Sequence, residues 1–134
     1  MNATKKRRSL PVGWSDADWA AARRAIRTVI WSYGLLNEPV GYKELTEEAD
    51  CGISCRSPWL TPILNEIAAH ERQSQRAHEK CWVTAFAVWS GTKRSSEGLF
   101  RLVPKSEWES MGKTAFCVQQ RRLAHIWIAE HPET

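Results

Sequence analysis

The sequence has 134 residues and an apolar share of 43%, which suits one globular domain, and its formal net charge is +4. It holds no apolar run of the roughly 18 residues that a membrane-spanning helix needs, and no export signal follows its basic start. We therefore expect a cytoplasmic protein with no membrane partner and with its four cysteines reduced.

The first segment, residues 1–13, is predicted to be a disordered basic arm because it is polar and has few side chains to bury. Its consecutive basic residues are Lys5, Lys6, Arg7 and Arg8. Such a run attracts nucleic-acid phosphate without sequence preference, and it also suits a solvated tail that aids solubility. Residues 14–131 are expected to form a single folded domain.

A long amphipathic helix is predicted after Ser15, a favourable N-cap residue that precedes two acidic side chains. Its apolar residues recur at helical spacing from Trp19 to Tyr33, and Gly34 fits a C-terminal stop. The helix therefore offers an apolar face of about five turns to the core.

One face of this helix, outside the apolar stripe, carries Arg24, Arg27 and Trp31 at positions i, i+3 and i+7. These side chains form a candidate patch for a protein partner, with guanidinium groups beside an aromatic ring. The other interpretation is that a second helix of the same domain covers Trp31.

Residues 40–103 follow the order helix, turn, helix and two-stranded hairpin. A short helix opens at Gly41, a turn covers residues 51–54, and a second helix begins at Thr61 with Pro62 in its first position. This order predicts a helix-turn-helix unit whose second helix could be presented to a partner.

The hairpin is predicted from a strand over residues 81–89, a polar loop over 91–98 and a returning strand over 99–103. Both faces of the first strand are apolar, which predicts a strand covered on each side. A last helix is expected around residues 116–127. The fold class is therefore α+β, as a winged helix-turn-helix with a β-hairpin and additional N- and C-terminal helices.

The histidines and cysteines do not predict a metal centre. Cys51, Cys55, His70, His78 and Cys81 are the only nearby set, and their spacing departs from the short ligand pairs of a closed zinc site. Cysteine is also a common small core residue. We expect no metal, no cofactor and no small-molecule substrate.

Residues 40–100 resemble the DNA-binding part of alkyltransferase-like proteins. The resemblance covers under half of the chain, and the residues that carry it are Gly41, Tyr42, Leu45, Ile63 and Leu64. The reactive Pro-Cys-His-Arg of that family is absent, because Cys81-Trp82-Val83-Thr84 stands in the nearest place. A thiol nucleophile needs a neighbouring base or cation. The resemblance thus implies a DNA-binding scaffold without the family's activity, and we expect no enzyme and no catalytic residue.

The candidate contacts with double-stranded DNA lie in the turn, the second helix and the polar loop. In the turn and helix they are Arg56, Ser57, Thr61 and Asn65. Asparagine and arginine can form paired hydrogen bonds with base edges, and threonine can touch a thymine methyl group. Lys93 and Arg94 would reach phosphate or the minor groove, and the basic arm would add non-specific attraction. The favoured function is a DNA-binding protein with a regulatory role.

An acidic segment supports a different hypothesis. Residues 38–50 hold five carboxylates against a single lysine, a local charge of −4, so the remaining sequence carries +8. Carboxylates beside a phosphate chain are unfavourable, although they could form a solvated face turned away from DNA. The alternative is a protein-interaction module, an adaptor or an inhibitor of a nucleic-acid-processing machine. Its contacts would be the patch on the first helix, the acidic residues Glu44, Glu47, Glu48 and Asp50, and those of the eight tryptophans that are exposed.

Overall fold

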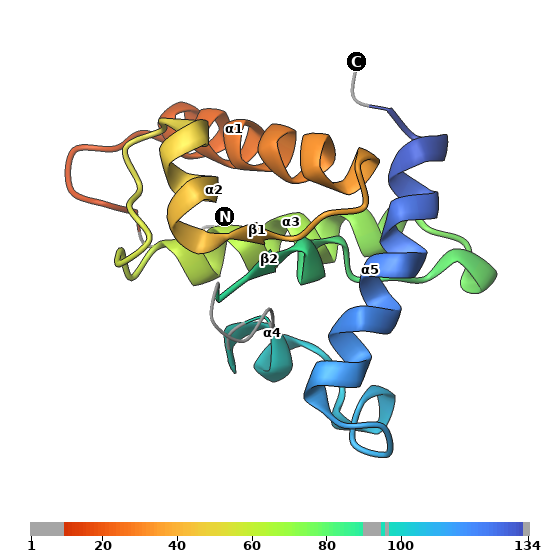
Figure 1. Ribbon diagram of the computed structural model, residues 1–134. Helices are drawn as coiled ribbons and strands as arrows, with labels where there is room; N and C mark the ends of the chain where they lie inside the picture. Colours follow the sequence, from red (N-terminus) through yellow and green to blue (C-terminus); the bar gives the residue numbers. More distant parts are fainter. Residues whose placement is uncertain (1–9, 90–94, 96, 133–134) are drawn as a thin grey trace, which may run out of the picture.

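The computed structural model describes residues 10–89, 95 and 97–132. In chain order its elements, with 3₁₀ helices labelled η, are α1 (Asp16–Leu35), β1 (Val40–Gly41), α2 (Tyr42–Ala49), α3 (Leu60–Ser74), η1 (Ala77–Glu79), η2 (Val83–Phe86), β2 (Ala87–Val88), α4 (Glu97–Leu102), η3 (Lys105–Glu107) and α5 (Lys113–Glu130). The segment η2 lies at the centre and contacts α1, α3 and α5, while α4 packs against α3 at one side (Figure 1).

Local sequence signals place α1 where it was predicted. The Ser15 hydroxyl accepts a hydrogen bond from the Asp18 N–H at 3.1 Å, and the Asp18 carboxylate accepts one from the Ser15 N–H at 2.9 Å. Gly34 lies inside the last turn, so its role differs from the predicted stop. A Cβ atom there would lie 2.4 Å from Cδ1 of Ile128, so a larger residue would have to displace the end of that side chain where α5 approaches.

The two helices predicted on either side of the turn are also present, as α2 and α3. Helix α2 ends at Ala49, its C-cap Asp50 takes a left-handed φ of 47°, and Gly52 follows with a φ of 84°. Helix α3 begins at Leu60, so Pro62 falls in its first turn, where a missing N–H costs no intrahelical hydrogen bond. The predicted boundary at Thr61 is therefore one residue from the observed one.

The predicted β-hairpin is wrong. Residues 83–86 form η2, and residues 97–102 form α4 where the returning strand was expected. The short strand β2 pairs instead with β1 in parallel, with Val40 opposite Ala87 and Gly41 opposite Val88. The winged architecture is thus not formed by a hairpin in the described residues, and the fold is a mixed one of helices with a two-stranded parallel sheet.

The error in the returning strand has a clear origin. Leu99, Phe100 and Val103 are spaced i, i+1 and i+4, so one face of a helix buries all three, and their exposures are 5%, 7% and 2%. Gly98 allows this helix to approach α3, because a Cβ atom there would lie 2.4 Å from the methyl carbon of Thr61. The prediction that residues 81–89 are covered on both sides holds for 81–88, which are all buried.

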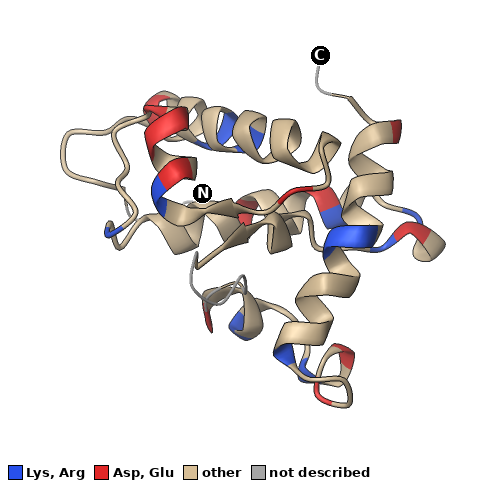
Figure 2. Ribbon diagram, viewed as in Figure 1, with Lys and Arg blue, Asp and Glu red and all other residues tan. Residues whose placement is uncertain are grey.

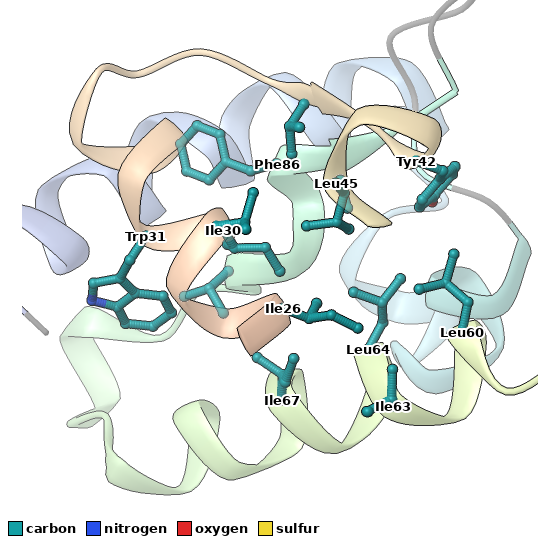
Figure 3. Close-up of a cluster of buried hydrophobic side chains, with 14 of the residues drawn as sticks. Ile26, Ile30, Trp31, Tyr42, Leu45, Leu60, Ile63, Leu64, Ile67 and Phe86 are labelled. Carbon is teal, nitrogen blue, oxygen red and sulfur yellow. The ribbon is translucent and has the colours of Figure 1, made fainter. Parts of the chain in front are cut away.

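The main core lies between α1, α2, α3, η2 and α5 (Figure 3). Its fully enclosed large side chains include Trp19, Ile26, Ile30, Trp31, Leu45, Ile63, Ile67, Phe86 and Ile128. A smaller cluster under α4 and the start of α5 joins Trp82, Phe100 and Phe116. Most of the tryptophan excess belongs to these cores, since Trp89 is the one tryptophan of the eight that is exposed, at 51%.

The predictions for the two ends of the chain have different outcomes. The last helix is present as α5, and the segment before it contains the 3₁₀ turn η3 followed by further turns. The basic residues of the predicted arm, Lys5 to Arg8, lie outside the described residues. In the part of the chain that the structure describes, none of the helices is both long and apolar enough to cross a membrane.

Candidate nucleic-acid interface

The N-terminal half of α3 brings two of the predicted contact residues together. Thr61 and Asn65 are one helical turn apart and half-buried, and both line a small pocket between α2, α3, η2 and α4. The remaining lining residues are Tyr42, Leu64, Thr84, Ser95 and Leu99. The methyl group of Thr61 faces Gly98, so this side chain spaces α3 from α4.

Ser95 fixes the end of the polar loop beside this helix. Its hydroxyl donates a hydrogen bond to the Ala87 carbonyl oxygen at 2.9 Å, and the residue is 2% exposed. Arg94 directly precedes Ser95 in the sequence. The predicted contacts Lys93 and Arg94 themselves lie outside the described residues.

The other predicted contacts, Arg56 and Ser57, lie in the turn before α3. Arg56 is exposed, whereas the Ser57 hydroxyl accepts a hydrogen bond from the Trp59 N–H at 3.0 Å and so stabilises the turn. The four predicted contacts therefore have different surroundings. Arg56 is an exposed cation and Asn65 has a half-buried amide, whereas Ser57 stabilises the turn and Thr61 separates α3 from α4. Arg56 and Asn65 are the two with side chains suited to base or phosphate contacts.

The pocket contains a buried hydroxyl without a hydrogen-bond partner among the described residues. Thr84 is 4% exposed, its Oγ1 atom is the unpaired group, and the residue lines a cavity of about 10 Å³. A cavity of this size is close to the minimum that one water molecule needs. The pocket is thus a polar hollow too small for an organic ligand.

Replacing Thr84 by valine is expected to leave the free energy of unfolding unchanged or to raise it by up to about 1 kcal/mol, because the change removes an unpaired buried hydroxyl. Urea denaturation measures the difference. Thr46→Val is the matched control, since the Thr46 hydroxyl is hydrogen-bonded to the Tyr42 carbonyl oxygen at 3.0 Å and should lose about 1 kcal/mol. Equal losses in the two variants would show that the Thr84 hydroxyl is hydrogen-bonded in solution.

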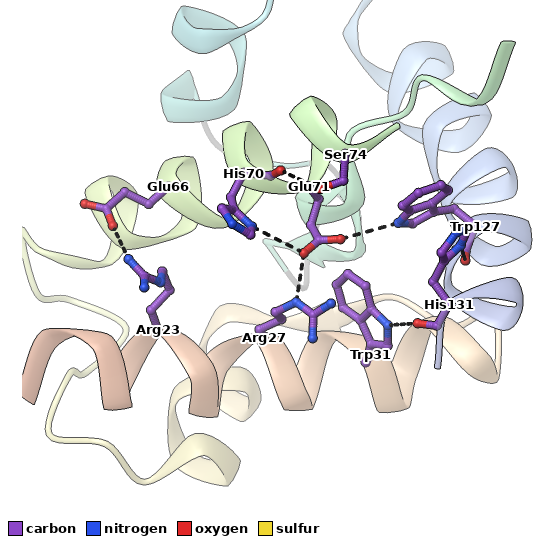
Figure 4. Close-up of polar contacts among 9 residues, drawn as sticks. All are labelled: Arg23, Arg27, Trp31, Glu66, His70, Glu71, Ser74, Trp127 and His131. Atoms are coloured by element: carbon purple, nitrogen blue, oxygen red, sulfur yellow. Dashed lines mark hydrogen bonds and ion pairs between the residues drawn. The ribbon is translucent and has the colours of Figure 1, made fainter. Parts of the chain in front are cut away.

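Helix α3 carries two carboxylates, Glu66 and Glu71, that would be unfavourable beside a phosphate chain, and both are directed to α1 (Figure 4). Glu66 accepts from Arg23 Nη1 at 2.8 Å and from Trp19 Nε1 at 3.0 Å. Glu71 lies deeper, with a side chain 9% exposed, and accepts from Arg27 Nε at 3.0 Å. Both charges are therefore compensated inside the fold, which weakens their repulsion of a phosphate chain.

Glu66 and Glu71 each accept hydrogen bonds from an arginine and from an indole N–H, that of Trp127 at 3.5 Å in the case of Glu71. A third carboxylate has the same two kinds of donor. Glu107 accepts from Trp82 Nε1 and from Arg72 Nη2, each at 3.0 Å, and the Arg72 guanidinium lies 4.2 Å from the centre of the Trp82 ring. A buried indole N–H needs an acceptor, and a carboxylate that also binds arginine supplies one without an unpaired charge. These tryptophans thus have a structural role.

The predicted protein-binding patch on α1 is only partly exposed. Arg24 is exposed, whereas Trp31 is 1% exposed and donates to the His131 carbonyl oxygen at 2.8 Å. The Arg27 guanidinium covers its ring at 3.8 Å. Trp31 is therefore a core residue under α5, as the second interpretation of this helix expected, and it offers no surface to a partner.

The acidic residues of α2 differ in their surroundings (Figure 2). Glu44 accepts from the Gly41 N–H at 3.1 Å, and Glu48 accepts from the Tyr33 hydroxyl. That hydrogen bond raises the pKa of Tyr33 to about 12, because ionised tyrosine could no longer donate it. Glu47 and Asp50 are exposed at the edge of a surface groove that runs to the turn before α3.

The cysteines have the surroundings of packing residues. Cys81 is fully buried, and Gln75 donates to its sulfur at 3.2 Å and accepts from its backbone N–H at 2.8 Å. Burial raises the pKa of the Cys81 thiol to about 12, so it stays protonated at neutral pH. Burial also raises the pKa of Cys51. Over the residues that the structure describes, no three histidine, cysteine or acidic side chains gather as metal ligands.

Comparisons with family models, with curated proteins and with solved structures yield no match for this chain. The pocket residues that the sequence did not reveal are Tyr42, Thr84 and Ser95, which come from three separate segments. The one local signal is Thr84, a lone polar residue inside the apolar run 81–89.

Proposed function

We propose that this protein is a non-enzymatic DNA-binding protein of the cytoplasm with a regulatory role, and that it contacts duplex DNA through the N-terminal half of α3. The observation that carries this proposal is the division of α3 into two faces. Asn65 lines the same pocket as Ser95, whereas Glu66 and Glu71 are bound to arginines of α1. The two carboxylates therefore do not face the surface that would contact DNA, and their repulsion of phosphate is reduced.

In this proposal α2, the turn and α3 act as a helix-turn-helix, and the loop with Lys93 and Arg94 takes the part of a wing. Arg56 and the loop cations neutralise phosphates, while Asn65 can donate to and accept from the adenine edge. The phosphate contacts of Arg56 and the loop cations supply affinity for any DNA sequence. The amide of Asn65 supplies sequence preference.

Fluorescence anisotropy of a labelled duplex tests the proposal at low and physiological salt. The double variant Lys93→Ala/Arg94→Ala should weaken binding to all sequences and lower the salt slope by about one to two units. Asn65→Ala should reduce sequence discrimination by about 1–3 kcal/mol at one base pair. Arg76→Ala, an exposed cation beyond the other end of α3, is the control and should bind as the wild type does. A wild-type protein that binds no duplex even at low salt would exclude the function.

A second candidate, a protein-interaction module such as an adaptor or an inhibitor of a nucleic-acid machine, is favoured by one observation. Glu47 and Asp50 are exposed together beside a groove of about 460 Å³ that ends at Ser54 and Cys55. The same anisotropy assay separates the two candidates, using Glu47→Gln/Asp50→Asn. Tighter DNA binding by this variant places the carboxylates near the phosphates, whereas unchanged DNA binding leaves them available to a protein partner.

A further inference from the structure

Helix α5 is apolar on two sides. Its inner side buries Phe116, Trp127 and Ile128. Its outer side exposes Val118 by 45%, Leu123 by 39% and Ile126 by 52%. A helix at the surface of a monomer normally presents charged and polar residues to water. The exposed apolar residues on this side, which lie between the charged Arg122 and Glu130, therefore point to a partner that covers them.

A shallow hollow of about 330 Å³ lies along this outer side, between α5 and η1. Leu123, Ile126 and Trp127 form its apolar part, and His78, Glu79 and Glu130 stand at its edge. An apolar centre with a polar rim is the usual composition of a protein interface. The hollow could accept an aliphatic side chain from a partner.

The charges on the same side of α5 identify that partner. Arg122 and Glu130 are exposed, and each lies four residues from Ile126, so all three share one stripe of the helix. If a second α5 lies antiparallel with Ile126 at a two-fold axis, Arg122 of each copy faces the partner's Glu130. A parallel arrangement would place like charges together. The stripe is therefore complementary to itself in one orientation, as a two-fold interface requires.

We propose that α5 is the dimerisation helix of this protein and that it packs antiparallel against α5 of a second copy. The Ile126 side chains meet at the axis, Leu123 lies against the partner's Ala129, and an ion pair between Arg122 and the partner's Glu130 closes each end. One pair of helices makes a small interface, so the dimer forms reversibly as the concentration rises. This proposal does not depend on DNA binding.

Sedimentation equilibrium over a range of concentrations tests it. The apparent mass of the wild type should rise from that of one chain, 15.3 kDa, towards twice that value. Arg122→Glu and Glu130→Arg should each weaken dimerisation at least about tenfold, because each places two like-charged pairs in the interface. The double variant Arg122→Glu/Glu130→Arg exchanges the charges and should restore the dimer. All three positions of the stripe are exposed, so circular dichroism should show unchanged folding.

Two further variants distinguish this surface from any other apolar one. Ile126→Glu should abolish the dimer, whereas Leu36→Glu, at a residue 69% exposed after the end of α1, should not affect it. A wild type that stays monomeric at every concentration overturns the proposal. So does a dimer that survives Ile126→Glu, or a double charge exchange that dimerises no better than the single variants.

Discussion

Replacing Phe86 by alanine should lower the free energy of unfolding by about 3–5 kcal/mol. Phe86 is 0% exposed and lies in η2, where α1 and α5 meet (Figure 3). Its ring carbon Cε2 would be 3.4 Å from a Cβ at Gly34, and Ile128 fills the same space. Because the neighbouring helices are already in contact, they cannot close over the cavity that alanine would leave.

Urea denaturation of Phe86→Ala measures this loss, and Trp89→Ala is its control. Trp89 is 51% exposed and makes one edge-to-face contact with Tyr42, at 4.7 Å between ring centres, so its removal should cost about 1 kcal/mol. In the predicted hairpin the rings of Phe86 and Trp89 would both lie in a strand that is covered on each side. Similar losses from the two variants would therefore favour the hairpin over the observed 3₁₀ segment.

The sequence predicted α1, α2, α3 and α5 well because their signals are local, whereas it missed α4. The cap at Ser15, the apolar spacing of α1 and the place of Pro62 each depend on residues within one or two turns. The pairing of Val40 with Ala87 depends on residues far apart in the chain, and a two-residue strand has no periodicity to detect. A run that is apolar on every side fits a buried strand or a buried 3₁₀ segment equally well.

The candidate site was predictable to a similar extent. Thr61 and Asn65 were predicted as DNA contacts of the second helix, and the structure places both of them in the lining of one pocket, which the sequence did not predict. The direction of the carboxylates was not predictable. Glu66 and Glu71 read as surface charges in the sequence, and only the packing of α3 on α1 shows that each binds an arginine more than 40 residues away.

The buried carboxylate of Glu71 gives the second large effect. Replacing Glu71 by leucine should lower the free energy of unfolding by about 2–3 kcal/mol, because it removes the carboxylate that accepts hydrogen bonds from Arg27 Nε and Trp127 Nε1. The loss stays below that of a fully buried pair, since the Arg27 side chain is 27% exposed and water can solvate it. Glu71→Gln should lose less, because its amide oxygen can still accept from Trp127.

The matched control is Glu66→Leu, which removes the equivalent carboxylate five residues earlier on α3. Its side chain is 28% exposed and that of Arg23 is 39% exposed, so we expect a loss of about 1 kcal/mol or less, and a smaller one at high salt. Glu71→Leu should be much less sensitive to salt, because its pair is shielded from ions. Paired urea denaturation at low and high salt measures both. If Glu71→Leu is as stable as the wild type, the desolvation of this carboxylate cancels its hydrogen bonds, and the group does not stabilise the packing of α1, α3 and α5.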